Sequence, residues 1–138
     1  MDAADSYAMA SKDRAVLIIE NDMAVAEVMK IVIGDEGFRT LVAASAAEGL
    51  RIAQSARVAV IFCDYGMPDM CGVDVIKVLR ANEATKDISM VLMSGHEVLW
   101  RQGRADAFLA KPFTPDAVTT LLRALVPVTA TSSVEAAG

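Results

Sequence analysis

Cysteine and long apolar runs are both scarce in this sequence. The two cysteines, Cys63 and Cys71, are too few for a disulfide framework or a four-ligand zinc site. No apolar run approaches the roughly 18–20 residues that cross a bilayer. Residues 1–5 have neither the basic nor the apolar character of a secretory leader. These absences predict a cytoplasmic protein that does not enter the membrane.

Positive charge is also sparse. The chain has 13 Lys and Arg against 18 Asp and Glu, a net charge of −5, and the basic residues do not cluster. Binding to nucleic acid depends on a basic patch that meets the phosphates. We therefore expect no direct DNA binding.

The two ends of the chain differ from its middle. They are rich in Ala, Ser, Thr and Asp and show no hydrophobic periodicity. We expect disordered tails over residues 1–13 and 127–138, flanking one domain over residues 14–126. The apolar content of 54% is ample for the core of such a domain.

Within this domain, apolar runs typical of strands alternate with segments of helical spacing. The predicted strands are 15–19, 39–43, 58–63, 89–93 and 107–110. The first predicted helix ends near residues 34–37 and turns five residues to the core: Val25, Val28, Met29, Val32 and Ile33.

Three further helices are predicted. One starts at a capping box, Ser45 to Glu48, and reaches about Ala53. The next spans 73–82, with Val75, Ile76 and Leu79 inward. The last begins after Thr114, with Pro115 first and a core face of Val118, Leu121, Leu122 and Leu125. The segment 96–104, between the helix over 73–82 and the last helix, is ambiguous, so a helix there, the fourth in chain order, would be short or irregular. The alternation predicts an α/β fold, a doubly wound five-stranded parallel sheet with helices on both faces.

Polar residues stand where several predicted strands end. Asp64 follows the apolar run 58–63, and because parallel strands share one carboxyl edge, it should meet the residues that follow the other strands. These are Glu20, Asn21, Asp22, Ser94, Gly95 and Lys111. An acidic cluster needs counter-charge, which Lys111 and a hard cation such as Mg²⁺ would supply. Asp64 would then be a nucleophile for a phosphoryl group.

With these residues in order, the chain resembles the receiver domain of two-component response regulators. The resemblance runs from about residue 15 to 125 and implies a flavodoxin-like receiver fold. It rests on the acidic patch 20–22, on Asp64 with Met67-Pro68 and Gly72, on Ser94-Gly95 and on Lys111-Pro112-Phe113.

The resemblance implies a role for each matching residue. Asp64 is the phosphoacceptor, and Mg²⁺ is held by Glu20, Asn21, Asp64 and the backbone carbonyl of Gly66, with Asp22 adjacent. The phosphoryl group is bound by Ser94, Gly95 and Lys111, and a cis peptide precedes Pro112. Phe108 suits equally the aromatic switch or an ordinary core residue. Gly66 and His96 lie where the family tunes dephosphorylation.

Two features depart from the family. Asn21 offers a neutral oxygen where an Asp is usual, so Mg²⁺ binding should be weaker. Ser94 and Lys111 are 17 positions apart (111 − 94), shorter than the family spacing by roughly one helical turn or more. Coupling to a partner through the usual fourth helix is therefore in question.

We expect a stand-alone response regulator, a signalling domain and not an enzyme, that is a monomer or weak dimer. A sensor histidine kinase or a histidine phosphotransfer protein would donate the phosphoryl group, and a downstream protein would be the target. One alternative is a phosphorylation-independent interaction module, and another is the receiver of a hybrid histidine kinase. Gly66 argues against a phosphohydrolase with a second Asp there, and Glu20-Asn21-Asp22 argues against a glycine-rich dinucleotide turn.

Overall fold

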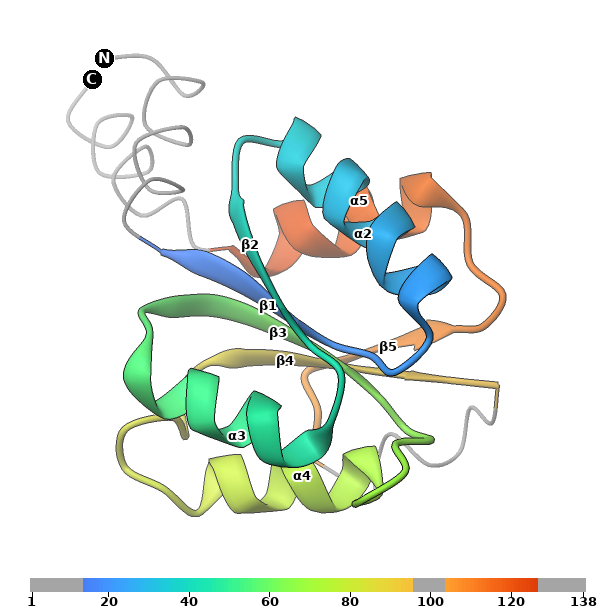
Figure 1. Ribbon diagram of the computed structural model, residues 1–138. Coiled ribbons are helices and arrows are strands. Elements are labelled where there is room, and N and C mark those ends of the chain that lie inside the picture. Colours follow the sequence, from blue (N-terminus) through green and yellow to red (C-terminus); the bar gives the residue numbers. More distant parts are fainter. Residues whose placement is uncertain (1–13, 96–103, 127–138) are drawn as a thin grey trace, which may run out of the picture.

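A parallel five-stranded sheet forms the centre of the computed structural model, which describes residues 14–95 and 104–126 (Figure 1). The strands are β1 (Ala15–Ile19), β2 (Arg39–Ala43), β3 (Val58–Asp64), β4 (Ser89–Ser94) and β5 (Ala107–Ala110). Their order in the sheet is β2-β1-β3-β4-β5. The helices described are α2 (Met23–Asp35), α3 (Ala46–Ser55), α4 (Gly72–Arg80) and α5 (Pro115–Leu125). The predicted doubly wound fold is confirmed.

The core lies on both faces of this sheet. Helices α2 and α5 cover one face, and α3 and α4 cover the other (Figure 1). Along β3, Phe62 packs toward α2 and α5, whereas Ile61 and Cys63 pack toward α3 and α4. Because both faces are covered, every residue of β1 and β3 is buried, which explains their continuous apolar sequences.

The helix starts follow the predicted capping chemistry. Thr114 Oγ1 accepts a hydrogen bond from the Ala117 N–H at 3.2 Å, with Pro115 as the first helical residue. Ser45 Oγ accepts from the Glu48 N–H at 3.2 Å. The Glu48 carboxylate, however, accepts from the Ala44 N–H at 2.9 Å, one residue before the partner that a capping box predicts.

One face of α2 differs from the prediction. Val28 was expected in the core but is 47% exposed, and Ala26 is buried with Met29 and Ile33 instead. The helix is apolar on most of its surface, so the hydrophobic pattern alone does not select the stripe that faces the sheet. Val25 and Val32 are half-buried beside that stripe.

Several element boundaries also shift by one or two residues. Helix α4 ends at Arg80 and not at Asn82, α3 continues to Ser55, and β3 and β4 include Asp64 and Ser94. Such shifts are usual at helix and strand ends. Gly37, with φ of 92°, makes the turn between α2 and β2 in a backbone conformation that favours glycine.

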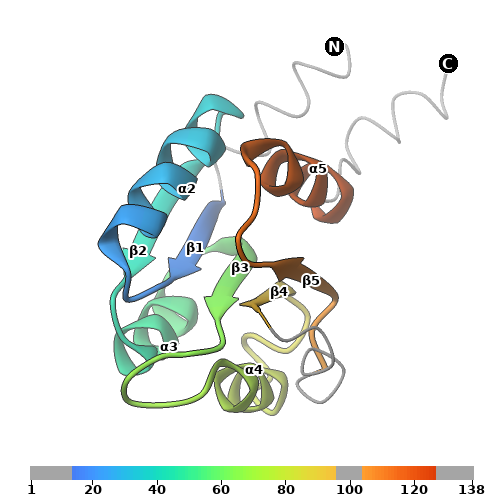
Figure 2. The same ribbon diagram turned by 90° about the vertical axis from the view of Figure 1, so that its right-hand side faces the viewer.

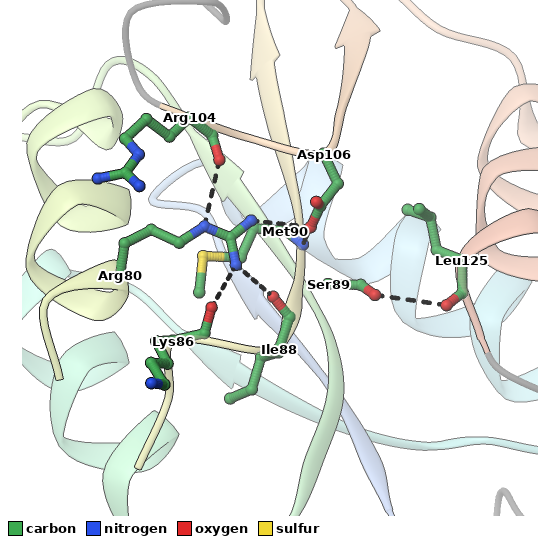
Figure 3. A network of polar contacts seen from close by, with 8 residues as sticks. All are labelled: Arg80, Lys86, Ile88, Ser89, Met90, Arg104, Asp106 and Leu125. Atoms are coloured by element: carbon green, nitrogen blue, oxygen red, sulfur yellow. Dashed lines mark hydrogen bonds and ion pairs between the residues drawn. The ribbon is translucent and has the colours of Figure 1, made fainter. Parts of the chain in front are cut away.

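The starts of β4 and β5 are tied to the end of α4 by one arginine (Figure 3). The Arg80 guanidinium donates to the carbonyl oxygens of Lys86, Ile88 and Arg104 at 2.7, 2.9 and 3.2 Å, and to the Asp106 carboxylate at 2.8 Å. The Asp106 carboxylate also accepts from the Met90 N–H at 2.8 Å. This network fixes the sheet edge opposite the carboxyl ends of the strands.

In the part of the chain that the structure describes, no helix is both long and apolar enough to span a membrane. The two predicted tails lie outside that part, as does most of the segment in which a short or irregular helix was expected.

Candidate functional site

Asp64 is the last residue of β3 and is only 7% exposed. The Tyr65 N–H donates to the Met93 carbonyl at 2.8 Å, and the Gly72 N–H donates to the Tyr65 carbonyl at 2.8 Å. A Cβ atom at Gly72 would lie 2.3 Å from the Asp64 carbonyl oxygen. The loop after Asp64 therefore closes on itself at a point that only glycine can occupy.

Lys111 brings together the carboxylates that the sequence placed at this edge. Its Nζ lies 2.7 Å from Glu20 Oε1 and 3.0 Å from Asp64 Oδ1. Its backbone N–H donates to the Ser94 carbonyl at 3.0 Å, and the peptide bond to Pro112 is cis, as predicted. The ammonium of Lys111 thus joins the ends of β1 and β3, and its backbone N–H joins the end of β5 to the end of β4.

Charge and burial oppose each other at this contact. Glu20 is fully buried, and this burial raises the pKa of its carboxyl group, although hydrogen bonds from Lys111 and the Asp22 N–H act to lower it. Burial also disfavours the charge on Lys111, but its hydrogen bonds to Glu20 and Asp64 outweigh that effect and raise the pKa of the ammonium. Lys111 is accordingly a lasting positive charge between two acids.

The donor groups here suit a hard cation. Mg²⁺ is commonly held by one or two carboxylates with water completing its shell, and Glu20 and Asp64 supply two carboxylates. Among residues 14–95 and 104–126, no group of three or more acidic, His or Cys side chains converges as a metal cluster. A Mg²⁺ ion would therefore draw on neutral oxygens too, such as the Asn21 amide and the Gly66 carbonyl.

Asn21 and Asp22 are exposed, unlike Glu20. Asp22 caps α2, because its Oδ1 accepts from the N–H groups of Ala24 and Val25 at 3.0 and 3.3 Å. That role explains Asp22 without a metal. Gly66 lies in open surroundings, since an added Cβ would meet no atom within 4 Å.

The other predicted site residues lie on the β4 and β5 side. Ser94 is 3% exposed at the end of β4 and is followed by Gly95, whose surroundings are open. Phe108 is half-buried in β5 and lines a groove of about 570 Å³ with Phe113 and Leu121. Its surroundings fit neither a fully packed core residue nor an exposed one. His96 lies outside the described residues.

The sequence did not single out Asp69, which lies in the loop after Asp64. Its Oδ1 accepts from the Ala46 N–H at 2.9 Å and its Oδ2 accepts from the Ala47 N–H at 3.0 Å. These two bonds lower the pKa of Asp69. No local spacing signals this contact, because 22 or 23 residues separate the partners.

Comparison with known proteins shows the family of this chain. Residues 16–123 match the model of the response regulator receiver domain, so the chain belongs to that family. MtrA of Mycobacterium tuberculosis, named a DNA-binding response regulator, is 30% identical over 111 residues, covering 79% of this chain and 49% of MtrA. The chain thus spans about half the length of the curated relatives it matches.

Solved structures share the fold. The chemotaxis response regulator CheY4 of Vibrio cholerae is 25% identical with a TM-score of 0.76, over 81% of this chain and 98% of CheY4. The response regulator TrrA of Thermotoga maritima, solved in complex with Mg(2+)-BeF, is 20% identical with a TM-score of 0.72, over 81% of this chain and 98% of TrrA. The predicted receiver fold is confirmed.

Proposed function

We propose that this receiver domain accepts a phosphoryl group on Asp64 and thereby changes its affinity for a partner protein. The observation that carries the proposal is the contact of Lys111 Nζ with both Asp64 and Glu20, at 3.0 and 2.7 Å, at the carboxyl edge of the sheet. This contact puts a nucleophilic carboxylate and a phosphate-binding cation side by side.

In the proposed transfer, an Asp64 carboxylate oxygen attacks the phosphorus of a phosphohistidine. The new O–P bond forms as the P–N bond breaks, and the released imidazole nitrogen takes up a proton. Lys111 would move from Asp64 to a phosphoryl oxygen and the Ser94 hydroxyl would donate to another. Both residues lie at strand ends beside Asp64, so the required shifts are local.

Glu20, Asn21, Asp64 and the Gly66 carbonyl would hold a Mg²⁺ ion, with Asp22 as a further candidate. Bound there, Mg²⁺ would neutralise charge on the phosphoryl oxygens. TrrA, which shares this fold, was solved in complex with Mg(2+)-BeF. Gly66 and His96 remain our candidates for tuning dephosphorylation.

We propose that the donor is a sensor histidine kinase or a histidine phosphotransfer protein in the cytoplasm, and that a downstream protein reads the phosphorylated state. Ser94 and Phe108 would carry the change to the surface around β4 and β5. We also propose a non-enzymatic, monomeric or weakly dimeric protein without direct DNA binding. The receiver of a hybrid kinase would use the same site.

The direct test is intact-mass measurement after incubation with phosphoramidate and Mg²⁺, a small donor that carries a P–N bond like phosphohistidine. We expect one added phosphoryl group, less of it after chelation, and none in Asp64→Asn. A folded protein that gains no phosphoryl group from this donor or from a phosphorylated histidine phosphotransfer protein would refute the proposal.

A phosphorylation-independent interaction module is the second candidate. It is favoured by Asn21, an exposed neutral side chain at the metal position, and by Lys111, which already neutralises the acids. Asn21→Asp separates the two candidates. A phosphoacceptor should label at lower Mg²⁺ concentration after this change, whereas an interaction module would stay unlabelled.

A further inference from the structure

We infer that Asp69 is a positioning residue that holds the loop after Asp64 in place for the cation. This inference rests on the proposed function, because it assigns the Gly66 carbonyl to the metal. Both carboxylate oxygens of Asp69 accept hydrogen bonds from helix α3, from the Ala46 N–H at 2.9 Å and from the Ala47 N–H at 3.0 Å.

Those two N–H groups are the ones that α3 cannot satisfy itself. The first N–H groups of a helix have no partner within the helix, and in α3 the local cap Ser45 serves only the Glu48 N–H. A carboxylate at this end also interacts favourably with the helix dipole. The bonds from Ala46 and Ala47 lower the pKa of Asp69, so Asp69 is ionised and bonded at neutral pH.

The loop that Asp69 holds is also anchored by Met67, which is 8% exposed and packs in the same core cluster as residues of α3 and α4. Its base is closed by the bond from the Gly72 N–H to the Tyr65 carbonyl at 2.8 Å. Beyond that base, the loop swings out beside α3 before it returns to α4 (Figure 2). Gly66 has no side chain of its own, and an added Cβ there would meet no atom within 4 Å, so the position of its carbonyl depends on how the neighbouring loop residues are held. Through its two hydrogen bonds to α3, Asp69 is a polar tether between the outer part of this loop and a helix.

Asp69 has two roles, a tether for the loop and a cap for α3, and a set of variants can separate them. Asp69→Ala removes both the tether and a helix cap, whereas Ser45→Ala removes a cap from the same helix end and leaves the loop untouched. Asp69→Asn keeps one side-chain oxygen as an acceptor and should retain part of the tether. These three variants form a matched set.

Two measurements on the full chain test the inference. The first is hydrogen exchange without metal. We expect Asp69→Ala to speed exchange over residues 65–71 and at residues 46–47, and Ser45→Ala to speed it only near the start of α3. Unchanged protection of residues 65–71 in Asp69→Ala would overturn the tether.

The second measurement is a calorimetric titration with Mg²⁺. Removal of a group that hydrogen-bonds directly to a metal ligand typically weakens metal binding by roughly 10- to 100-fold. Asp69 acts on the Gly66 carbonyl only through the loop, so we expect the lower limit, about tenfold, for Asp69→Ala. Ser45→Ala should stay within about twofold of the unchanged chain, with Asp69→Asn in between. Equal weakening by Ser45→Ala, or none by Asp69→Ala, would overturn the positioning role.

The two measurements also distinguish this inference from the proposed function. A chain that takes no Mg²⁺ in any form would overturn the assignment to the cation together with the metal site itself. Hydrogen exchange would still decide whether Asp69 holds the loop. A chain that binds Mg²⁺ but takes no phosphoryl group would overturn the phosphoacceptor and leave the role of Asp69 standing.

Discussion

The ammonium of Lys111 is the charge on which the site depends, and its removal should show a defined pH dependence. In Lys111→Met, Glu20 and Asp64 lose the cation at 2.7 and 3.0 Å. Loss of one partner from a buried pair costs about 3–5 kcal/mol. Because Lys111 is 27% exposed, we expect Lys111→Met to lower the free energy of unfolding by a smaller amount, about 2 kcal/mol at pH 8.

The sign of the pH effect follows from Glu20. Its pKa is already raised above 4.5 by burial, and loss of the Lys111 hydrogen bond should raise it further. Because the pKa of Glu20 is higher in the folded than in the unfolded state, its contribution to the free energy of unfolding is complete below about pH 4.5. That contribution is lost as the pH rises through the pKa of the folded state. Urea unfolding with a chelator should therefore show a smaller deficit at pH 5 than at pH 8. An equal deficit at both would contradict this electrostatic account.

At the scale of elements, Arg80 joins α4 to the starts of β4 and β5, as Figure 3 shows. Arg80→Ala should lower the free energy of unfolding by about 1–3 kcal/mol, because three carbonyl groups and the half-exposed Asp106 carboxylate lose their hydrogen bonds from the guanidinium. Arg80→Lys should restore little, since an ammonium cannot reproduce the planar fork.

The matched control for Arg80 is Lys86→Ala, which removes an exposed ion pair with Glu83 at 3.1 Å on the neighbouring segment. Exposed pairs contribute about 0–1 kcal/mol. In urea unfolding, the free energy of unfolding of Arg80→Ala should be clearly lower than that of Lys86→Ala. If both variants lose the same small amount, the Arg80 network does not stabilise the sheet edge.

Helix α2 allows a test of which face packs on the sheet. Met29 is fully buried and Val28 is 47% exposed, although the two are neighbours in sequence. Met29→Ala should cost about 2–4 kcal/mol, whereas Val28→Ala should change the free energy of unfolding by at most about 0.5 kcal/mol. Denaturant unfolding of both variants measures this difference. A larger loss in the free energy of unfolding for Val28→Ala would mean that Val28 belongs to the buried face of α2, as the sequence predicted.

At the scale of the whole molecule, the pattern of burial determines which strands and helices can be predicted from the sequence. The strands β1 and β3 are covered on both faces, so their apolar runs are unbroken and easily recognised. Because the carboxyl ends of parallel strands share one edge, the sequence alone predicts that Asp64 lies near Glu20 and Lys111. The distances at that edge, 2.7 and 3.0 Å, needed the structure.

Other features depend on information that no local pattern carries. The apolar surface of α2 has several possible core faces, and Ala26 is too small to mark the buried one. The contact of Asp69 with α3 depends on the path of a loop, and neither Asp69 nor its partners Ala46 and Ala47 belong to a local motif that would indicate it. Local pattern predicts elements and edges well, and loop-mediated contacts poorly.

The response of the whole fold to Mg²⁺ separates a metal-dependent receiver from an interaction module. A ligand that binds only the folded state at 100 times its Kd adds about 2.7 kcal/mol to the free energy of unfolding. For a domain of this size that corresponds to a rise in Tm of about 10 °C. Asp64→Asn should reduce the rise, because it removes one of the two carboxylates beside Lys111. Thermal unfolding in Mg²⁺, with Na⁺ at matched ionic strength as the control, measures the effect. An identical Tm in both salts would mean that Lys111 alone balances Glu20 and Asp64, and that the site works without a metal.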